Sequence, residues 1–240
     1  MNRVVVCPNH KWPALAATQI IEFLQERLST SPEPMVTVAL AGGTTPAPVY
    51  RLWSRLAPAS FDWTRVRLFL SDERMVPQEH PDSNFRVARE SLPLAPHLHA
   101  VNTMRTAEGA AEDYESLIRD FVAVGTQFPV PQFDLILLGV GNDGHTASLF
   151  PGSPVLAEKR RLVSPAVHPE SKQARVTFTL PLIQAASRVA FLVSGAAKSC
   201  VLARLLSTAP DHELPAALAA GLSREVVWMV DEDAHGGPGG

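Results

Sequence analysis

Short runs of apolar, often β-branched residues alternate along this chain with longer segments in which apolar residues recur at helical spacing. Such alternation is typical of a mostly parallel sheet whose strands are joined by crossover helices. The predicted strands are Val4–Cys7, Met35–Ala41, Val66–Ser71, Phe133–Gly139, Leu162–Pro165, Arg175–Leu180, Arg188–Ser194 and Val226–Val230. We therefore expect an α/β fold.

The segments between these strands carry the helical pattern. The apolar residues of the first segment are spaced so that one helix face can pack on the sheet. The predicted helices are Pro13–Leu28, Pro46–Leu56, Asn84–Ser91, Ala107–Val124, Ala196–Leu206 and Pro215–Ala220. Interior linkers are short, so one domain over residues 1–234 accounts for the chain, followed by a flexible glycine-rich tail over 235–240.

Charge and cysteine content narrow the possible partners. The net charge is −3 over 240 residues, so the chain has no basic field to attract nucleic acid or an anionic membrane. Cys7 and Cys200 are too few for a disulfide framework. No signal peptide and no apolar run of membrane-spanning length are present. These features predict a soluble, cytoplasmic protein that acts on a small molecule.

The segment Phe133–Pro151 runs an apolar strand into a polar turn that carries Asp143 and His145. Open α/β sheets bind ligands at the carboxyl ends of their strands, which is where this turn is expected. A neutral imidazole can take a proton from water, and Asp143 is near enough in sequence to fix its tautomer. The alternative is structural, with Asp143 as a turn or cap residue and His145 as an ordinary packed histidine.

A second strand is predicted to end in Gly42, Gly43 and Thr44, followed by a proline suited to the first turn of a helix. Bare glycine backbone lets the oxygen atoms of a phosphate approach N–H groups at a helix N-terminus. The same residues are also what a strand-to-helix turn needs for its own geometry. The motif alone therefore leaves both interpretations open.

Three adjacent charges, Asp72, Glu73 and Arg74, follow a third predicted strand. In the functional interpretation, Asp72 or Glu73 orients a donor or serves as a base, and Arg74 presents a planar cation to a substrate oxygen. In the structural interpretation, the segment is a charged loop in which Asp72 caps a neighbouring element.

Two further cations lie at the far end of the chain. Arg175 is on a predicted strand, and Lys198 lies just past a strand–glycine turn at the start of a helix. The positive end of a helix dipole is unfavourable for a lone lysine, and an intervening phosphate would satisfy both. The alternative is a solvated surface lysine.

Together these residues resemble the 6-phosphogluconolactonase family, within the wider glucosamine-6-phosphate isomerase and deaminase superfamily. The matching blocks are LAGGTTP at 40–46, SDER at 71–74, SN at 83–84, LGVGNDGHTASLFPG at 138–152, RVTFTLPLI at 175–183 and FLVSGAAK at 191–198. The resemblance implies a single-domain, three-layer Rossmann-like fold with helices on both faces of the sheet, and a reaction that needs no metal and no cofactor.

The implied reaction is hydrolysis of 6-phospho-D-glucono-1,5-lactone to 6-phospho-D-gluconate. In this hypothesis His145 is the general base, oriented by Asp143 or Asp72, and Arg74 steadies the developing oxyanion or the ring hydroxyls. By resemblance, the 6-phosphate is held by Gly42, Gly43, Thr44, Arg175 and Lys198. The remaining partners are expected to be copies of the chain itself, as a monomer or a small homo-oligomer.

Several alternatives remain beside this hypothesis. Deaminases of the superfamily carry an aromatic residue at the position of Arg74 and a catalytic glutamate at the position of Phe150. A sensor that binds sugar phosphate without catalysis would use the same fold, usually with a DNA-binding appendage. Within the lactonase reaction, Ser148 is a weak candidate for a covalent nucleophile, because no G-x-S-x-G motif occurs. A metal site is weaker still, since Asp143 and His145 lack a clear third ligand.

Overall fold

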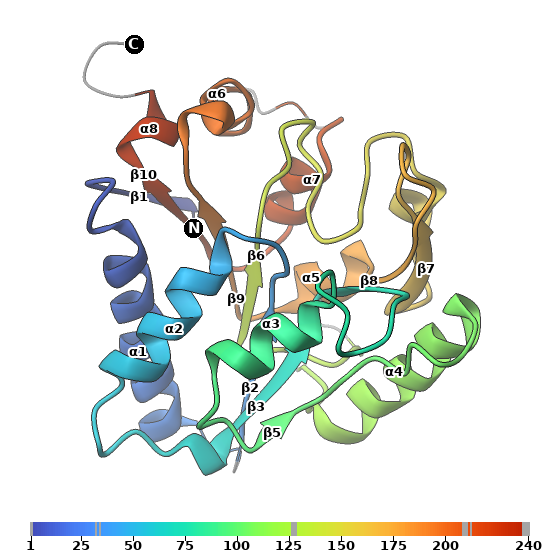
Figure 1. Cartoon of the computed structure of the whole chain (residues 1–240), viewed down its shortest axis with the longest axis horizontal. Helices are drawn as coiled ribbons and strands as arrows, with labels where there is room; N and C mark the ends of the chain where they lie inside the picture. The colour runs from blue at the N-terminus through green and yellow to red at the C-terminus, as the bar shows by residue number, and fades with distance from the viewer. Residues whose placement is uncertain are drawn as a thin grey trace.

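The computed structural model of the chain describes residues 2–31, 33, 35–125, 129–207, 211 and 213–236. Its centre is a parallel sheet, for which the described residues supply seven strands in the order β1-β10-β9-β6-β2-β3-β5 (Figure 1). The strands are β1 (Asn2–Cys7), β2 (Val36–Leu40), β3 (Val66–Leu70), β5 (His97–Leu98), β6 (Leu135–Leu138), β9 (Arg188–Val193) and β10 (Val226–Asp231). Strands from both ends of the chain therefore belong to one sheet.

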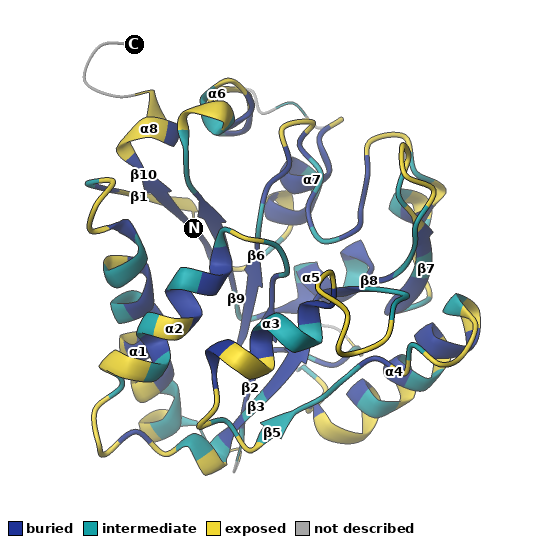
Figure 2. Cartoon of the chain, viewed as in Figure 1, coloured by how far each residue is buried: buried dark blue, intermediate teal, exposed yellow. Residues whose placement is uncertain are grey.

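Alternate residues of the inner strands pack into two separate cores, one on each face of the sheet. On β9, for example, Ala190 and Leu192 join one core, whereas Val189 and Phe191 join the other. Figure 2 shows the inner strands as buried along their length, with exposed residues on the helices and loops around them. Burial on both faces explains why the strands read as continuous apolar runs in the sequence.

Helices cover both faces, which confirms the predicted three-layer α/β arrangement. One core receives α1 (Trp12–Thr30), α2 (Pro46–Leu56) and α3 (Asn84–Ser91). The other core receives α4 (Ala107–Phe121), α5 (Leu180–Ala185), α6 (Ser199–Leu206), α7 (Pro215–Gly221) and α8 (Glu232–His235). The described residues also include three short 3₁₀ helices, which are η1 (Trp63–Arg65), η2 (Pro154–Ala157) and η3 (Ala196–Lys198).

Most predicted elements form close to their expected bounds, and the differences lie at their ends. The helix predicted over 107–124 stops at Phe121, because Val122 leaves the helix in an extended conformation. The helix predicted over 196–206 starts with the turn η3 before α6 begins at Ser199. Such differences at helix ends are common, since the first and last turns lack the full set of backbone hydrogen bonds.

A second, antiparallel sheet lies beside the main one and was not expected. Its strands follow the order β4-β8-β7, with bounds β4 (Asp72–Arg74), β7 (Val163–Val167) and β8 (Ala174–Phe178). The strands predicted near 162–165 and 175–180 thus exist but do not enter the parallel sheet. The chain between β7 and β8 spans only 168–173, which is too short for the crossover that parallel pairing requires.

The predicted tail begins inside a helix. His235 is the last residue of α8, and Gly236 ends that helix in a left-handed conformation with φ of 104°. Residues 237–240 lie outside the described residues. Within the described part of the chain, no helix combines the length and apolarity needed to cross a membrane.

Candidate active site

Loops from the carboxyl ends of β2, β3, β6 and β9 surround a cleft of about 220 Å³, and the small sheet forms one of its walls. Most of the site residues predicted from the sequence line this cleft, whereas Asp143, Glu73 and Ser148 do not. The predicted residues in the lining are Gly42, Gly43, Thr44, Asp72, Arg74, His145, Arg175 and Lys198. The fold therefore brings together segments that are more than 150 residues apart in sequence.

The turn after β6 holds His145 against Asp143. The imidazole Nδ1 lies 2.6 Å from Asp143 Oδ1, which also accepts a hydrogen bond of 3.1 Å from the His145 backbone N–H. Gly141 makes this geometry possible, because a Cβ at that position would overlap both the imidazole and the carboxylate. With Nδ1 bound to Asp143, the imidazole Nε2 is the nitrogen left for a ligand.

The same contacts set the charge state of Asp143. Partial burial alone would raise the pKa of its carboxyl, but the hydrogen bonds and charge of His145 outweigh burial and lower that pKa. Asp143 is therefore ionised at neutral pH. An ionised carboxylate on Nδ1 favours the tautomer in which Nε2 carries a free lone pair.

Phe150 forms the wall behind the histidine. Its ring is 2% exposed and lies 4.9 Å from the His145 ring, centroid to centroid. On its other side Phe150 meets His168 edge-on at 5.0 Å. The imidazole is therefore fixed by a hydrogen bond at one edge and by an aromatic ring against one face.

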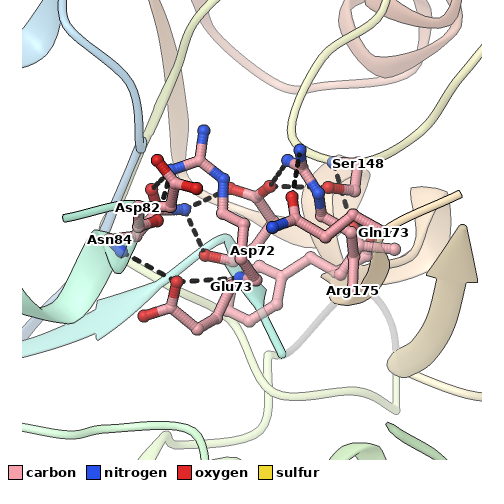
Figure 3. A network of polar contacts seen from close by, with 10 residues as sticks. Asp72, Glu73, Asp82, Asn84, Ser148, Gln173 and Arg175 are labelled. Carbon is pink, nitrogen blue, oxygen red and sulfur yellow. Dashed lines mark hydrogen bonds and ion pairs between the residues drawn. The ribbon is translucent and has the colours of Figure 1, made fainter. Parts of the chain in front are cut away.

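Asp72 has different partners from those of Asp143, although both were predicted as candidates to orient His145. Its buried carboxylate accepts hydrogen bonds from Ser148 Oγ at 2.6 Å and from Asn84 Nδ2 at 3.1 Å. It also lies 3.8 Å from Arg175 Nη1. Figure 3 shows Asp72 between Asn84 on one side and Ser148 and Arg175 on the other. No contact with His145 is found among the described residues, so Asp143 alone makes that contact.

Glu73, the neighbouring acid, is directed away from the cleft. It is 1% exposed and accepts hydrogen bonds from the backbone N–H groups of Arg74, Asn84 and Phe85 and from the Ser83 hydroxyl. Burial outweighs these bonds and raises its pKa. Its position at the start of α3 indicates that Glu73 anchors this helix to β4.

Two arginines of the small sheet line the cleft, each anchored on one edge of its guanidinium. Arg74 Nη1 donates to the Asp82 carbonyl at 2.8 Å and to Asn84 Oδ1 at 2.6 Å. Arg175 Nη2 donates to Gln173 Oε1 at 3.0 Å. Burial lowers the pKa of Arg175, partly offset by the charge of Asp72, which marks it as a desolvated cation.

Lys198 closes the opposite side of the cleft at the end of η3. Partial burial lowers the pKa of its ammonium group, while the charge of Asp143 acts in the other direction. The turn before it is fixed by Asp231, which accepts hydrogen bonds from Ser194 Oγ at 2.6 Å and from the Gly195 N–H at 3.0 Å. The backbone just before Lys198 is thus held in place by hydrogen bonds, and the lysine itself lines the cleft.

The two glycines after β2 have different surroundings. Gly43 has φ of 92° and open space at the Cβ position, so ligand atoms can approach its backbone. At Gly42 a Cβ would overlap the side-chain amide of Asn84. The absence of a side chain at Gly42 thus makes room for a protein group.

Three functional neighbours were missed in the sequence: Asn84, Gln173 and Asp231. Asn84 stands in a matching block, which was the only signal, and nothing in its local sequence showed that it contacts Arg74. Gln173 and Asp231 follow no recognisable motif. Within the described part of the chain, no group of three or more His, Cys, Asp or Glu residues is arranged to hold a metal ion.

A family model described as glucosamine-6-phosphate isomerases/6-phosphogluconolactonase matches residues 11–228 of this sequence. The chain belongs to this family. Among curated members, it is 40% identical over 205 residues to the 6-phosphogluconolactonase of Synechocystis, a match that covers 82% of each protein. It is 37% identical over 210 residues to the chloroplastic 6-phosphogluconolactonase 3 of Arabidopsis thaliana, covering 82% of this chain and 64% of that longer protein.

Solved structures of family members agree with the fold described above. The 6-phosphogluconolactonase of Trypanosoma brucei superimposes with a TM-score of 0.85 at 30% identity, covering 98% of this chain and 97% of the other. The enzyme of that name from Thermotoga maritima gives a TM-score of 0.81 at 31% identity, with 96% and 100% coverage. The resemblance therefore extends over nearly the whole described fold.

Proposed function

We propose that this protein hydrolyses 6-phospho-D-glucono-1,5-lactone to 6-phospho-D-gluconate. The observation that carries the proposal is the position of the His145–Asp143 pair in the same cleft as Arg74, Arg175 and Lys198. A base and a set of cations within one small cleft suit a substrate that has an electrophilic carbonyl and a phosphate. The names of the relatives support the same assignment.

His145 acts as the general base in this proposal. Its Nδ1 is occupied by Asp143, so Nε2 takes a proton from a water molecule held above the lactone carbonyl. The water oxygen then bonds to carbon 1, and the carbonyl electron pair moves onto oxygen. Asp143 stabilises the imidazolium that forms, because its carboxylate lies 2.6 Å from Nδ1.

Collapse of the tetrahedral intermediate completes the reaction. The bond from carbon 1 to the ring oxygen breaks, and the imidazolium returns its proton to that oxygen, which becomes the hydroxyl at carbon 5. Arg74 stabilises the negative charge on the former carbonyl oxygen, since Nη1 is anchored on protein and Nη2 remains for a ligand. No covalent intermediate with the protein is required.

The phosphate occupies the end of the cleft formed by Gly43, Thr44, Arg175 and Lys198, with the backbone of Gly42 beside it. Because Pro46 and Pro48 lack a backbone N–H, the first turn of α2 offers the phosphate the Ala47 N–H and the positive end of the helix dipole. A bound dianion would reverse the depression of the Lys198 pKa by adding negative charge next to the ammonium. Binding at this remote group orients the carbonyl relative to His145.

The family also contains isomerases that act on an amino sugar, and Phe150 argues against that reaction here. Ring opening and proton transfer between carbons need further acid–base groups near the base. The position where the related deaminases carry glutamate holds a buried phenyl ring packed on His145. Lactone hydrolysis needs no proton donor at this position.

A coupled assay tests the proposal. Glucose 6-phosphate dehydrogenase generates the lactone in place, and 6-phosphogluconate is measured with and without the protein, so that spontaneous hydrolysis is subtracted. Release of product well above this blank is expected. Turnover equal to the blank, or release of ammonia from glucosamine 6-phosphate, would contradict the proposed reaction.

The site of action within the cell is proposed to be the cytoplasm. Cys7 is buried and Cys200 exposed, and both are free thiols, which suits a reducing compartment. Some relatives are named as chloroplastic proteins, so the direct test is fluorescence microscopy of the tagged full-length protein.

The protein is proposed to be a monomer or a small homo-oligomer, which light scattering tests.

A further inference from the structure

The side chain of Asn84 connects three separate segments at the edge of the cleft. It is 2% exposed and begins α3. Its Oδ1 accepts a hydrogen bond of 2.6 Å from Arg74 Nη1, and its Nδ2 donates to the backbone carbonyl of Asp72 at 2.8 Å and to Asp72 Oδ1 at 3.1 Å. The same carboxamide fills the space that a Cβ on Gly42 would occupy.

The orientation of this amide is determined by its neighbours. Arginine has only donors, so the atom facing Arg74 must be the amide oxygen. The two Asp72 oxygens are acceptors in the ionised residue, so the atom facing them must be the amide nitrogen. A carboxamide of this length is the only standard side chain that offers one acceptor and two donors in this space.

We propose that Asn84 is a positioning residue for lactone hydrolysis, whose carboxamide fixes Arg74 and Asp72 relative to the glycine turn after β2. The inference rests on the proposed function. Asn84 acts through Arg74, because it anchors Nη1 and thereby sets the direction in which Nη2 faces the cleft. Through Asp72 it also holds the carboxylate that lies 3.8 Å from Arg175.

The close packing of Asn84 against Gly42 couples the positions of the three segments. Gly42 belongs to the phosphate end of the cleft, whereas Arg74 belongs to the carbonyl end. Because Asn84 is packed between them, a shift of either segment displaces the amide and breaks its short hydrogen bonds. In this proposal, the distance between the glycine turn and Arg74 in the cleft therefore depends on this one side chain.

The first test compares steady-state constants of Asn84→Ala with those of the wild type. We expect kcat to fall roughly 10- to 100-fold, as for a reacting group displaced by a fraction of an ångström, with KM changed less than about threefold. KM changes less because Lys198, which is proposed to hold the phosphate, lies on η3 and not on the segments that Asn84 connects. A kcat within about twofold of the wild type would overturn the inference.

Asn84→Asp is a second variant of equal size, and its Tm shows whether it folds despite the acceptor that it places against Asp72. It keeps the size of the side chain and places an acid in the first turn of α3, which is favourable for the helix. It still accepts from Arg74 but turns an acceptor toward Asp72, so kcat is expected to fall as in Asn84→Ala. The matched control is Ala88→Gly, which weakens the same helix without touching the amide and should lower Tm while sparing kcat.

A pair of double-mutant cycles separates positioning from a purely structural role. Gly42→Ala is expected to reduce kcat as strongly as Asn84→Ala, and to add less than about a factor of two once Asn84 is already alanine. Arg74→Ala is likewise expected to cost less in the Asn84→Ala background than alone. Equal factors in both backgrounds would show that Asn84 acts independently of these residues and would overturn the inference.

The proposed function and the positioning role fail in different ways. If the wild type shows no lactone hydrolysis above the blank, the proposed function is wrong. If the wild type turns over the lactone and the cycles are additive, the function stands and the role of Asn84 is wrong.

Discussion

Arg74 and Arg175 are direct register partners in the antiparallel pair of β4 and β8. Directly opposed residues of an antiparallel pair have side chains on the same face, and like charges in this arrangement repel. Asp72, which lies 3.8 Å from Arg175 Nη1, offsets only part of this charge. The pair therefore forms a site whose repulsion is relieved when an anion binds in the cleft.

Inorganic phosphate is accordingly expected to stabilise the protein. At ten times its dissociation constant the gain is about 1.4 kcal/mol, or roughly 3–6 °C in Tm for a chain of this size. Differential scanning fluorimetry in phosphate and in chloride of equal ionic strength measures the shift. Arg175→Ala should lose most of it, because Arg175 belongs both to this pair and to the proposed phosphate site. An unchanged shift in that variant would place the phosphate elsewhere.

Loss of the base should abolish turnover without abolishing binding. His145→Ala is expected to lower kcat by roughly 10²- to 10⁴-fold, because it removes the proposed proton acceptor. Asp143→Asn should reduce kcat as well, since an amide no longer favours the tautomer with a free Nε2. Product binding, measured by calorimetry, should persist in both. Unchanged turnover in His145→Ala would rule out this base.

Gly141→Ala tests whether the geometry of the base is as strict as the turn suggests. A Cβ at this position would overlap the His145 ring and the Asp143 carboxylate, so kcat is expected to approach that of His145→Ala. Gly221→Ala is the matched control. It ends α7 with open space around it, and should raise stability by up to about 1 kcal/mol with normal kcat. Normal kcat in Gly141→Ala would mean that the pair is dispensable.

Ser148 is expected to be structural. Its hydroxyl is fully buried, lies outside the cleft lining and donates to Asp72 at 2.6 Å. Ser148→Ala should therefore lower the free energy of unfolding by about 1–3 kcal/mol while retaining most of kcat. Rapid-quench kinetics and intact-mass spectrometry should show neither a burst nor an acyl-enzyme. A trapped acyl group on Ser148 would establish the covalent route instead.

His99 should make the folded state sensitive to acid. It is stacked between Phe69 and Phe121, and burial, with the charge of Arg67, lowers its pKa from 6.5 to about 4. Between these two values the unfolded chain binds the proton and the folded chain does not, so the free energy of unfolding falls as pH decreases from 6.5 to 4. His99→Phe should flatten this part of the curve, measured by urea titration.

Other groups do not confuse the interpretation of this experiment. Glu73, whose pKa is raised by burial, titrates in both the wild type and the His99→Phe variant, so its contribution cancels in their difference. A difference between the two proteins that stays constant from pH 7 to pH 4 would show that His99 is not the acid-sensitive group.

The inner strands of the main sheet could be predicted because each one is a run of mainly apolar residues, a pattern that is visible within the strand itself. Val36–Leu40 is apolar except for Thr37, and Leu135–Leu138 is apolar throughout, which is typical of a sheet covered on both faces. The strand Asp72–Arg74 carries three charges and no apolar residue, so nothing local predicts it. It exists because β8 supplies its backbone partners, a contact with a segment about 100 residues away.

The site followed the same rule. His145 and Asp143 are two residues apart, so their contact was visible in the sequence, and the structure shows it. The contact between Asp72 and Ser148 could not be predicted from the sequence, because the two residues are 76 positions apart. It depends on how the small sheet packs against the turn after β6. Nothing in the sequence indicated that position 42 must lack a side chain. The group that occupies the space is the amide of Asn84, which begins α3.

The packing of Asn84 against Gly42 also constrains the order in which these positions can change during evolution. A larger residue at 42 is obstructed while asparagine occupies 84, whereas a smaller residue at 84 first empties the space that a side chain at 42 would need. Drift at the pair must therefore pass through a state that has lost the amide and its hold on Arg74. Selection for turnover removes variants that have lost the amide, so Gly42 and Asn84 are expected to be conserved together.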